Sequence, residues 1–222
     1  MICIPILAQN TADALNKMRV ASDFCDLMEI RLDVMDVFDL KEMVGFASKP
    51  IIITYRSKKE GGEGSAPYHT RIDYLREAIR LGVEFVDVEY TVPLEHRRPL
   101  FENRGRTKLI LSKHFRNGTP SRESLSNLFR KMAATGAHVV KIVTRAGTPE
   151  DNLTVLGLIP QAEGMGVKIV TFCMGPLGRI SRVASPLLGG AFTFAALERG
   201  QESASGQMTV KEMKMILEVL SQ

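Results

Sequence analysis

The sequence predicts an α/β protein in which eight parallel strands close into a (β/α)8 barrel, the TIM barrel. Two observations favour this fold. Short apolar, β-branched runs alternate with longer amphipathic segments from one end of the chain to the other, and about eight such runs can be counted. No break in composition marks a linker, so we expect residues 1–222 to form a single domain. An open, doubly wound sheet is the alternative.

The expected strands are short runs rich in Ile, Val, Leu and Phe. A parallel strand that is covered on both faces should be almost continuously apolar, which these runs are, except near their ends. In chain order they are Ile2–Leu7, Leu27–Leu32, Ile51–Arg56, Phe85–Tyr90, Lys108–Ser112, Val139–Val143, Lys168–Phe172 and Ala191–Ala195.

The segments between these runs carry apolar residues at spacings of three and four, which is typical of helices packed on a core. Local signals agree with this assignment. Ser121 precedes a polar first turn, and Thr148 is expected to cap a helix that has Pro149 at its first position. Glycines such as Gly136 follow a helical pattern and precede a strand, as glycines at helix ends do.

The composition excludes several classes of function. With 45% hydrophobic and 24% charged residues, the chain is neither disordered nor of low complexity. The net charge of +4 comes from scattered basic residues, which disfavours a nucleic-acid or membrane partner. No apolar run approaches the roughly 20 residues of a membrane span, and no signal peptide is apparent, so we expect a cytoplasmic protein. Three scattered cysteines predict neither a disulfide framework nor a zinc site.

Polar side chains recur at the ends of five successive expected strands. Glu29, Arg31 and Asp33 occupy alternate positions, so the strand period of two sends all three to one face. The later strands repeat the pattern with Thr54 and Arg56, Asp87 and Glu89, Ser112 and His114, and Lys141. Each cluster alone is most simply a set of rim charges with local ion pairs. Together they predict one charged pocket, because the carboxyl ends of barrel strands meet at a single mouth.

Lys141 is chemically the most informative residue because it lies inside the apolar run VVKIV. Burial of an ammonium is costly, and cations such as Arg56, Arg182 or a protonated His114 would further favour the neutral amine. A neutral amine attacks a ketone, and the resulting iminium makes a neighbouring proton easier to remove. His114 is the natural base for that proton. We expect the other three histidines to be structural or solvated.

Glycine-rich loops follow the third and seventh expected strands, as KEGGEG and MGPLGRISR. In the second loop, Gly175 and Gly178 would suit a phosphate group, whereas Arg182 would suit a carboxylate, and the residues leave both possibilities open. After the last strand, Ser203 and Gln207 are placed to cover the pocket.

These stretches resemble the type I 3-dehydroquinate dehydratase family, from the first strand to the final helix. In order they are EIRLD at Glu29–Asp33, TYRSKKEGGE at Thr54–Glu63, DVE at Asp87–Glu89, SKHFRNGTP at Ser112–Pro120, VVKIV at Val139–Val143, MGPLGRISR at Met174–Arg182 and SASGQ at Ser203–Gln207. The chain departs from the family at three positions. Phe115 stands where the family usually has Asp, Arg116 where it usually has Phe, and Ser205 where it usually has Pro.

The resemblance implies a hydro-lyase that converts 3-dehydroquinate to 3-dehydroshikimate in the shikimate pathway. It implies that Lys141 forms a Schiff base with the substrate, that His114 is the general acid/base, and that Glu89 orients His114. The implied substrate-binding residues are Arg182, Ser203 and Gln207 on the carboxylate side of the ring, and Glu29, Arg31, Arg56 and Glu60 at its hydroxyls. A homodimer is also implied, with no metal or organic cofactor, since the lysine iminium serves as the electron sink.

Two other interpretations of the residues stay open. A class I aldolase would use the same lysine to cleave a carbon–carbon bond, and would hold a phosphate after the seventh and eighth strands. A barrel without catalytic activity that binds an anionic metabolite would leave the lysine inside an apolar strand unexplained.

Overall fold

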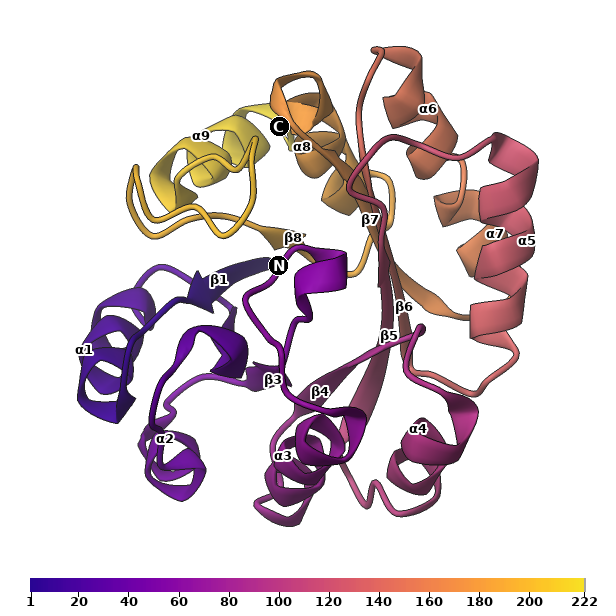
Figure 1. Ribbon diagram of the computed structural model, residues 1–222. Coiled ribbons are helices and arrows are strands. Elements are labelled where there is room, and N and C mark those ends of the chain that lie inside the picture. The colour runs from indigo at the N-terminus through magenta and orange to yellow at the C-terminus, as the bar shows by residue number, and fades with distance from the viewer. Residues whose placement is uncertain (222) are drawn as a thin grey trace.

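The computed structural model describes residues 1–221 and confirms the barrel (Figure 1). Within these residues, eight parallel strands pair in the order β7-β6-β5-β4-β3-β2-β1-β8. The strands are β1 (Ile2–Ile6), β2 (Leu27–Arg31), β3 (Ile51–Thr54), β4 (Phe85–Glu89), β5 (Lys108–His114), β6 (Val139–Arg145), β7 (Lys168–Met174) and β8 (Thr193–Phe194). Next to β8, the backbone N–H of Ala191 donates to the carbonyl of Ile169 on β7 at 2.7 Å, which brings the two edges together. The alternative of an open sheet is therefore wrong.

Helices surround the barrel on its outer side (Figure 1). They are α1 (Thr11–Ala21), α2 (Leu40–Phe46), α3 (Tyr68–Arg80), α4 (Leu94–Glu102), α5 (Arg122–Ala133), α6 (Glu150–Leu156), α7 (Ile159–Gly164), α8 (Arg179–Leu187) and α9 (Val210–Leu220). Short 3-10 turns occur at η1 (Leu32–Val34), η2 (Lys58–Glu60) and η3 (Pro176–Gly178). Across residues 1–221, no helix combines the length and the apolar character that crossing a membrane requires.

Element boundaries differ from the predictions mainly at the carboxyl ends of strands. β5, β6 and β7 each run two residues further than expected, because the backbone ladder continues through polar positions such as Arg145, which pairs with Met174. Ser121 caps α5 as expected, by accepting from the N–H of Ser124. The predicted cap at Thr148 is one residue off. The helix begins at Glu150, and the N–H of Thr148 donates instead to the carboxylate of Asp151.

The inside of the barrel changes character along its axis. A buried apolar cluster fills the interior from the amino ends of the strands up to the floor of the carboxyl-end cavity, formed by Cys3, Leu27, Ile52, Ile110, Val139, Val143, Val170, Phe172, Phe192 and Phe194. One inward position later on several strands, the side chains are polar. A separate and larger apolar core lies between the strands and the helices. The strands are therefore held from both sides, and burial of each large apolar side chain contributes about 1.5–3 kcal/mol.

Candidate active site

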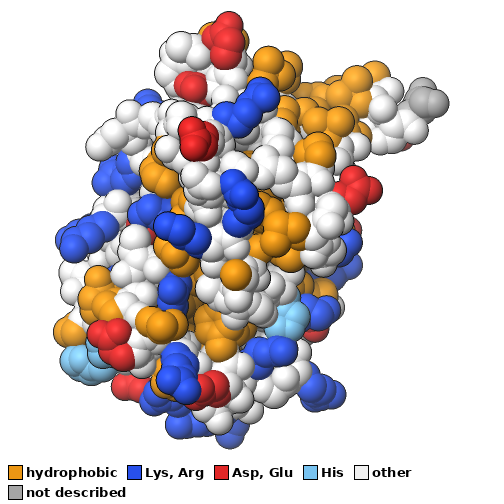
Figure 2. Space-filling view, turned by 90° about the vertical axis from the view of Figure 1, so that its right-hand side faces the viewer, with side chains coloured by type: hydrophobic (Ala, Val, Ile, Leu, Met, Phe, Trp, Pro, Cys, Tyr) orange, Lys and Arg blue, Asp and Glu red, His pale blue; other side chains and the backbone are white. Residues whose placement is uncertain are grey.

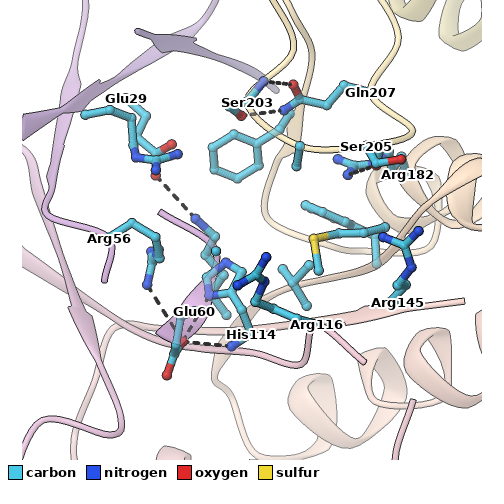
Figure 3. A pocket seen from close by; sticks show the side chains of 18 of the residues that line it. Glu29, Arg56, Glu60, His114, Arg116, Arg145, Arg182, Ser203, Ser205 and Gln207 are labelled. Carbon is cyan, nitrogen blue, oxygen red and sulfur yellow. Dashed lines mark hydrogen bonds and ion pairs between the residues drawn. The ribbon is translucent and has the colours of Figure 1, made fainter. Parts of the chain in front are cut away.

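A cavity of about 580 Å³ opens at the carboxyl ends of the strands (Figure 3). It brings together most of the residues singled out in the sequence, namely Glu29, Arg31, Arg56, Glu60, His114, Lys141, Arg182, Ser203 and Gln207. Glu89 is not part of this lining. Four of the five strands with polar carboxyl ends thus contribute side chains to the lining of one cavity. The fifth, β4, contributes none to the lining, but its Asp87 contacts Lys141.

Lys141 projects from the middle of β6 and is only 4% exposed. Its Nζ lies 3.3 Å from Oε1 of Glu29 and 3.2 Å from Oδ2 of Asp87, and 4.3 Å from the ring centre of Phe194. Arg56, one of the cations expected near this amine, contacts the same Oδ2 of Asp87 at 2.8 Å. The groups in direct contact with Lys141 are two carboxylates and an aromatic face.

A buried ion-pair network surrounds this lysine. Arg56 contacts Asp87 at 2.8 Å and Glu89 at 3.3 Å, and it donates to the hydroxyl of Ser112 at 2.9 Å. Although burial opposes the shift, Arg56 and then Lys141 hold the pKa of Asp87 well below its usual range. Because buried charges are costly unless they are paired, this network fixes the positions of the carboxylates beside Lys141.

His114 ends β5, on the strand next to Lys141. Its Nδ1 lies 3.2 Å from Oε2 of Glu60, and its backbone N–H donates to the same oxygen at 2.9 Å. We expected Glu89 to orient this ring, which is wrong. Glu89 accepts from the N–H of Ser57 and pairs with Arg56, whereas Glu60, reached through the turn after β3, contacts His114.

The charges around His114 determine its tautomer. Although burial opposes the shift, the contact with His114 and the charges of Arg56 and Lys113 lower the pKa of Glu60 to about 2. A carboxylate that is ionised can only accept, so Nδ1 carries the proton and Nε2 presents a lone pair. Burial, together with Arg56, lowers the pKa of His114 to about 4. The ring is therefore neutral at pH 7 and suited to act as a base.

Arg182, on α8, is fully buried and stacks over the ring of Phe172 at 4.4 Å. Within residues 1–221, no carboxylate lies within ion-pair distance, and its Nε and Nη1 lack a hydrogen-bond partner. Burial lowers its pKa to about 10, so it stays a cation at pH 7. A buried, uncompensated guanidinium at the edge of a cavity is suited to bind the carboxylate of a ligand.

The loop after β8 closes over Arg182. The carbonyl of Ser205 accepts from Nη2 of Arg182 at 3.3 Å and from the N–H of Gly175 at 3.0 Å. Gly206 has φ +84°, and a β carbon there would overlap the backbone of Gly175. Ser205 contributes here through its backbone carbonyl. Ser203 and Gln207 bond to each other across this loop, at 2.8 and 3.0 Å.

The glycine at position 178 has a packing explanation. A β carbon there would overlap the carbonyl of Cys173, so the close approach of the turn to β7 requires glycine. This accounts for Gly178 without a phosphate group.

Sequence reasoning missed several residues of the site. Asp87 contacts Lys141, and further side chains line the cavity beyond those predicted, namely Arg116, Arg145, Phe172, Met174 and Phe194. The alternation that revealed Lys141 also applies to these positions. Arg145 follows Lys141 by four residues on β6, and Phe172 and Met174 alternate on β7.

The remaining histidines lie away from the cavity. His69 and His96 are on α3 and α4, and His138 precedes β6, where its Nδ1 accepts from the N–H of Leu109 at 3.0 Å. The three cysteines are buried and unpaired. In the part of the chain from residue 1 to 221, no group of three or more His, Cys, Asp or Glu side chains is placed to hold a metal ion.

Comparisons with known proteins agree on one family. Residues 2–222 match the family model described as type I 3-dehydroquinase. The 3-dehydroquinate dehydratase of Thermococcus gammatolerans is 39% identical over 220 residues, covering 99% of each chain. That of Methanococcus maripaludis strain C5 is 34% identical over 222 residues, covering 99% of this chain and all of the relative.

Solved structures agree. The type I 3-dehydroquinate dehydratase from Clostridium difficile, described as containing covalently modified comenic acid, has a TM-score of 0.88 at 28% identity, covering 99% of this chain and 91% of that one. The orotidine 5'-phosphate decarboxylase from Pyrococcus horikoshii has a TM-score of 0.61 at 10% identity, covering 98% of this chain and 99% of that one, and shares the fold alone.

Proposed function

Because this chain belongs to the type I 3-dehydroquinase family, we propose that it dehydrates 3-dehydroquinate to 3-dehydroshikimate through a Schiff base on Lys141. One observation carries the mechanism. A buried amine faces a polar cavity beside a neutral histidine, on the adjacent strand, whose lone pair is free. These are the two groups needed to hold a ketone covalently and to remove the proton next to it.

The first step joins the substrate to Lys141. The amine must first lose a proton, for which the oxygens of Asp87 and Glu29 lie 3.2 and 3.3 Å from Nζ. The nitrogen then adds to the ketone carbon, and water leaves to form the iminium.

His114 performs the proton transfers that follow. Its Nε2 takes a proton from the carbon next to the iminium, and the electron pair moves onto the nitrogen to give an enamine. When the pair returns, the tertiary hydroxyl leaves, and His114 supplies the proton that makes it water. Hydrolysis of the iminium then consumes one water, so one water is released overall, and no metal or organic cofactor is needed because the iminium stores the electrons.

The substrate-binding roles are assigned from where the charged and polar side chains lie in the cavity. Arg182, whose guanidinium lacks an acidic partner, binds the ring carboxylate with help from Ser203 and Gln207 in the covering loop. Glu29, Arg31 and Arg56 bind the ring hydroxyls, and Figure 3 shows Glu29 and Arg56 on the side of the cavity opposite Arg182. Glu60 acts through His114, so it is a positioning residue, and Glu89 positions Arg56.

The cellular setting is part of the same proposal. We place the enzyme in the cytoplasm and in the shikimate pathway, which leads to chorismate and the aromatic amino acids. We further propose a homodimer. Exposed apolar side chains on α9, namely Met215, Val219 and Leu220, support a contact surface of this kind. Figure 2 shows further apolar side chains gathered at the upper right of its view.

Reductive trapping tests the proposed chemistry. Incubation with 3-dehydroquinate and sodium borohydride is expected to add the mass of one reduced ligand to the protein, at Lys141, and to abolish dehydration. Intact-mass and peptide-mass measurements locate the adduct. A protein incubated with borohydride alone is the control. An adduct on another lysine, or full activity with no adduct, would contradict the Schiff base at this position.

A pH profile tests the coupling between His114 and Glu60. Because the base works in its neutral form and its pKa is about 4, kcat/KM should hold as pH falls from 7 to 5 and fall below pH 4. The Nζ of Lys113 lies 3.0 Å from Oε1 of Glu60. In Lys113→Met, Glu60 loses this cation and stabilises protonated His114 more strongly. The pH at which kcat/KM falls to half on the acid side should therefore rise by roughly half to one pH unit.

Lys113→Arg is the matched control, because it keeps the cation beside Glu60. In this variant kcat/KM should fall at the same acidic pH as in the wild type. An acid limb that stays in place in Lys113→Met would show that Lys113 does not act on the base through Glu60.

A further inference from the structure

The cavity contains more cations than the proposed reaction uses. Its deeper cations are paired with acids: Arg31 with Asp33 at 2.8 Å, Arg56 with Asp87 at 2.8 Å, and Lys141 with Glu29 and Asp87. Three arginines of the lining have no carboxylate within ion-pair distance in residues 1–221, namely Arg116, Arg145 and Arg182. 3-Dehydroquinate carries one carboxylate, which Arg182 accommodates, so two guanidinium groups are left over.

The two remaining arginines lie at the mouth of the cavity. Arg116 follows β5 and Arg145 ends β6, and both side chains are exposed and reach into the cavity from the same side (Figure 3). On β6, the inward-facing positions after Lys141 are Val143 and Arg145. At about 3.3 Å per residue, Arg145 starts about 13 Å further along the strand than the lysine. An anion bound beside Arg145 therefore lies further out along the barrel axis than the proposed imine on Lys141.

Arg116 is held in place before any ligand arrives. Its Nη1 donates to the carbonyl of Lys58 at 3.2 Å. Its Cδ and Nε lie 3.6 Å from the point that a β carbon on Gly61 would occupy, so the side chain rests on the glycine turn after β3. A guanidinium has five N–H donors, and this one uses a single donor on the protein. Because it is already ordered, binding a ligand costs it little further conformational entropy.

We propose that Arg116 and Arg145 form an outer anion site at the mouth, which takes an oxyanion of the phosphate or carboxylate class. Two guanidinium groups, one just after β5 and one at the end of β6, can each donate paired N–H bonds to such a group, and no carboxylate of the described chain competes for them. An anion bound there narrows the entrance to Lys141. The site therefore binds either a second anionic group of a larger ligand or a free oxyanion that competes with the substrate.

Binding of inorganic phosphate tests the site without any turnover. Calorimetric titration at low ionic strength is expected to show one phosphate bound per chain. In the variant Arg116→Gln/Arg145→Gln, the dissociation constant should rise at least tenfold. Arg106→Gln is the matched control, because Arg106 is an exposed arginine at the opposite end of the barrel, before β5, and this variant should bind phosphate like the wild type.

Arg182→Gln separates the outer site from the inner one, and it should retain phosphate binding. Loss of binding in Arg182→Gln together with normal binding in the double variant would place the anion in the inner site and overturn the proposal. An equal loss in Arg106→Gln, or no binding by the wild type, would also overturn it. Arg116→Lys/Arg145→Lys keeps both charges, and an intermediate dissociation constant is expected because paired N–H donation is lost.

Inhibition of dehydration gives an independent readout. Phosphate should inhibit competitively, with an inhibition constant that rises at least tenfold in the double glutamine variant. Since the titration contains no substrate, its outcome does not depend on the proposed reaction. A failure of the proposed anion site can therefore be told apart from a failure of the proposed dehydration.

Discussion

Replacing Lys141 by Arg should lower kcat for 3-dehydroquinate by a factor on the order of 10⁴ or more, because a guanidinium cannot form the imine. The substitution keeps a cation between Glu29 and Asp87, which lie 3.3 and 3.2 Å from Nζ in the wild type. The loss should therefore appear in turnover and not in folding. Steady-state kinetics and the thermal unfolding midpoint measure the two effects separately.

Lys141→Ala should lose turnover to the same extent and should also be less stable. Removing the ammonium leaves the buried carboxylate of Glu29 without its cation, while Asp87 keeps Arg56 at 2.8 Å, and breaking a buried pair costs about 3–5 kcal/mol. Lys168→Ala is the matched control, since Lys168 is exposed at the start of β7. If Lys141→Arg retained more than a few per cent of wild-type turnover, covalent catalysis by this residue would be ruled out.

Replacing His114 by Ala should lower kcat by a factor on the order of 10² to 10⁴, while imine formation at Lys141 continues. The reason is that His114 supplies the only neutral ring nitrogen with a free lone pair in the cavity lining. The fold should tolerate the change, because Glu60 keeps Lys113 at 3.0 Å and the hydroxyl of Thr91 at 2.8 Å as partners.

Two measurements on the His114→Ala variant separate binding from proton transfer. Borohydride trapping should still label Lys141, and the labelled fraction should build up because elimination is slow. Exchange of the substrate proton with deuterated solvent should fall along with kcat. His69→Ala, an exposed position on α3, is the control. A near-normal rate in His114→Ala would assign the proton transfer to another group.

The fold and the location of the site could be predicted from the chain itself. Apolar runs separated by amphipathic segments depend on local periodicity, and the outcome of that periodicity, a covered parallel barrel, is tightly constrained. The same period of two placed Glu29, Arg31 and Lys141 on inward-facing positions, and the geometry of the barrel then required them to converge. These predictions needed only neighbouring residues and the rules of strand packing.

The choice of partners inside the pocket was different. Glu60 and Glu89 are both buried acids near the carboxyl ends of strands, and the sequence contains no feature that says which of them reaches His114. That was decided by η2, a turn whose path places Glu60 on the ring while Arg56 and Ser57 take up Glu89. Likewise, the acids in direct contact with Lys141 are Glu29 and Asp87, which lie on strands distant in the chain.

The sequence by itself therefore determined the barrel and the set of side chains that face its mouth, because strand periodicity is a local property. The tertiary structure alone decided which charges touch. An ion pair depends on distances of a few ångströms between residues far apart in the chain, and those distances exist only once strands and turns have been assembled.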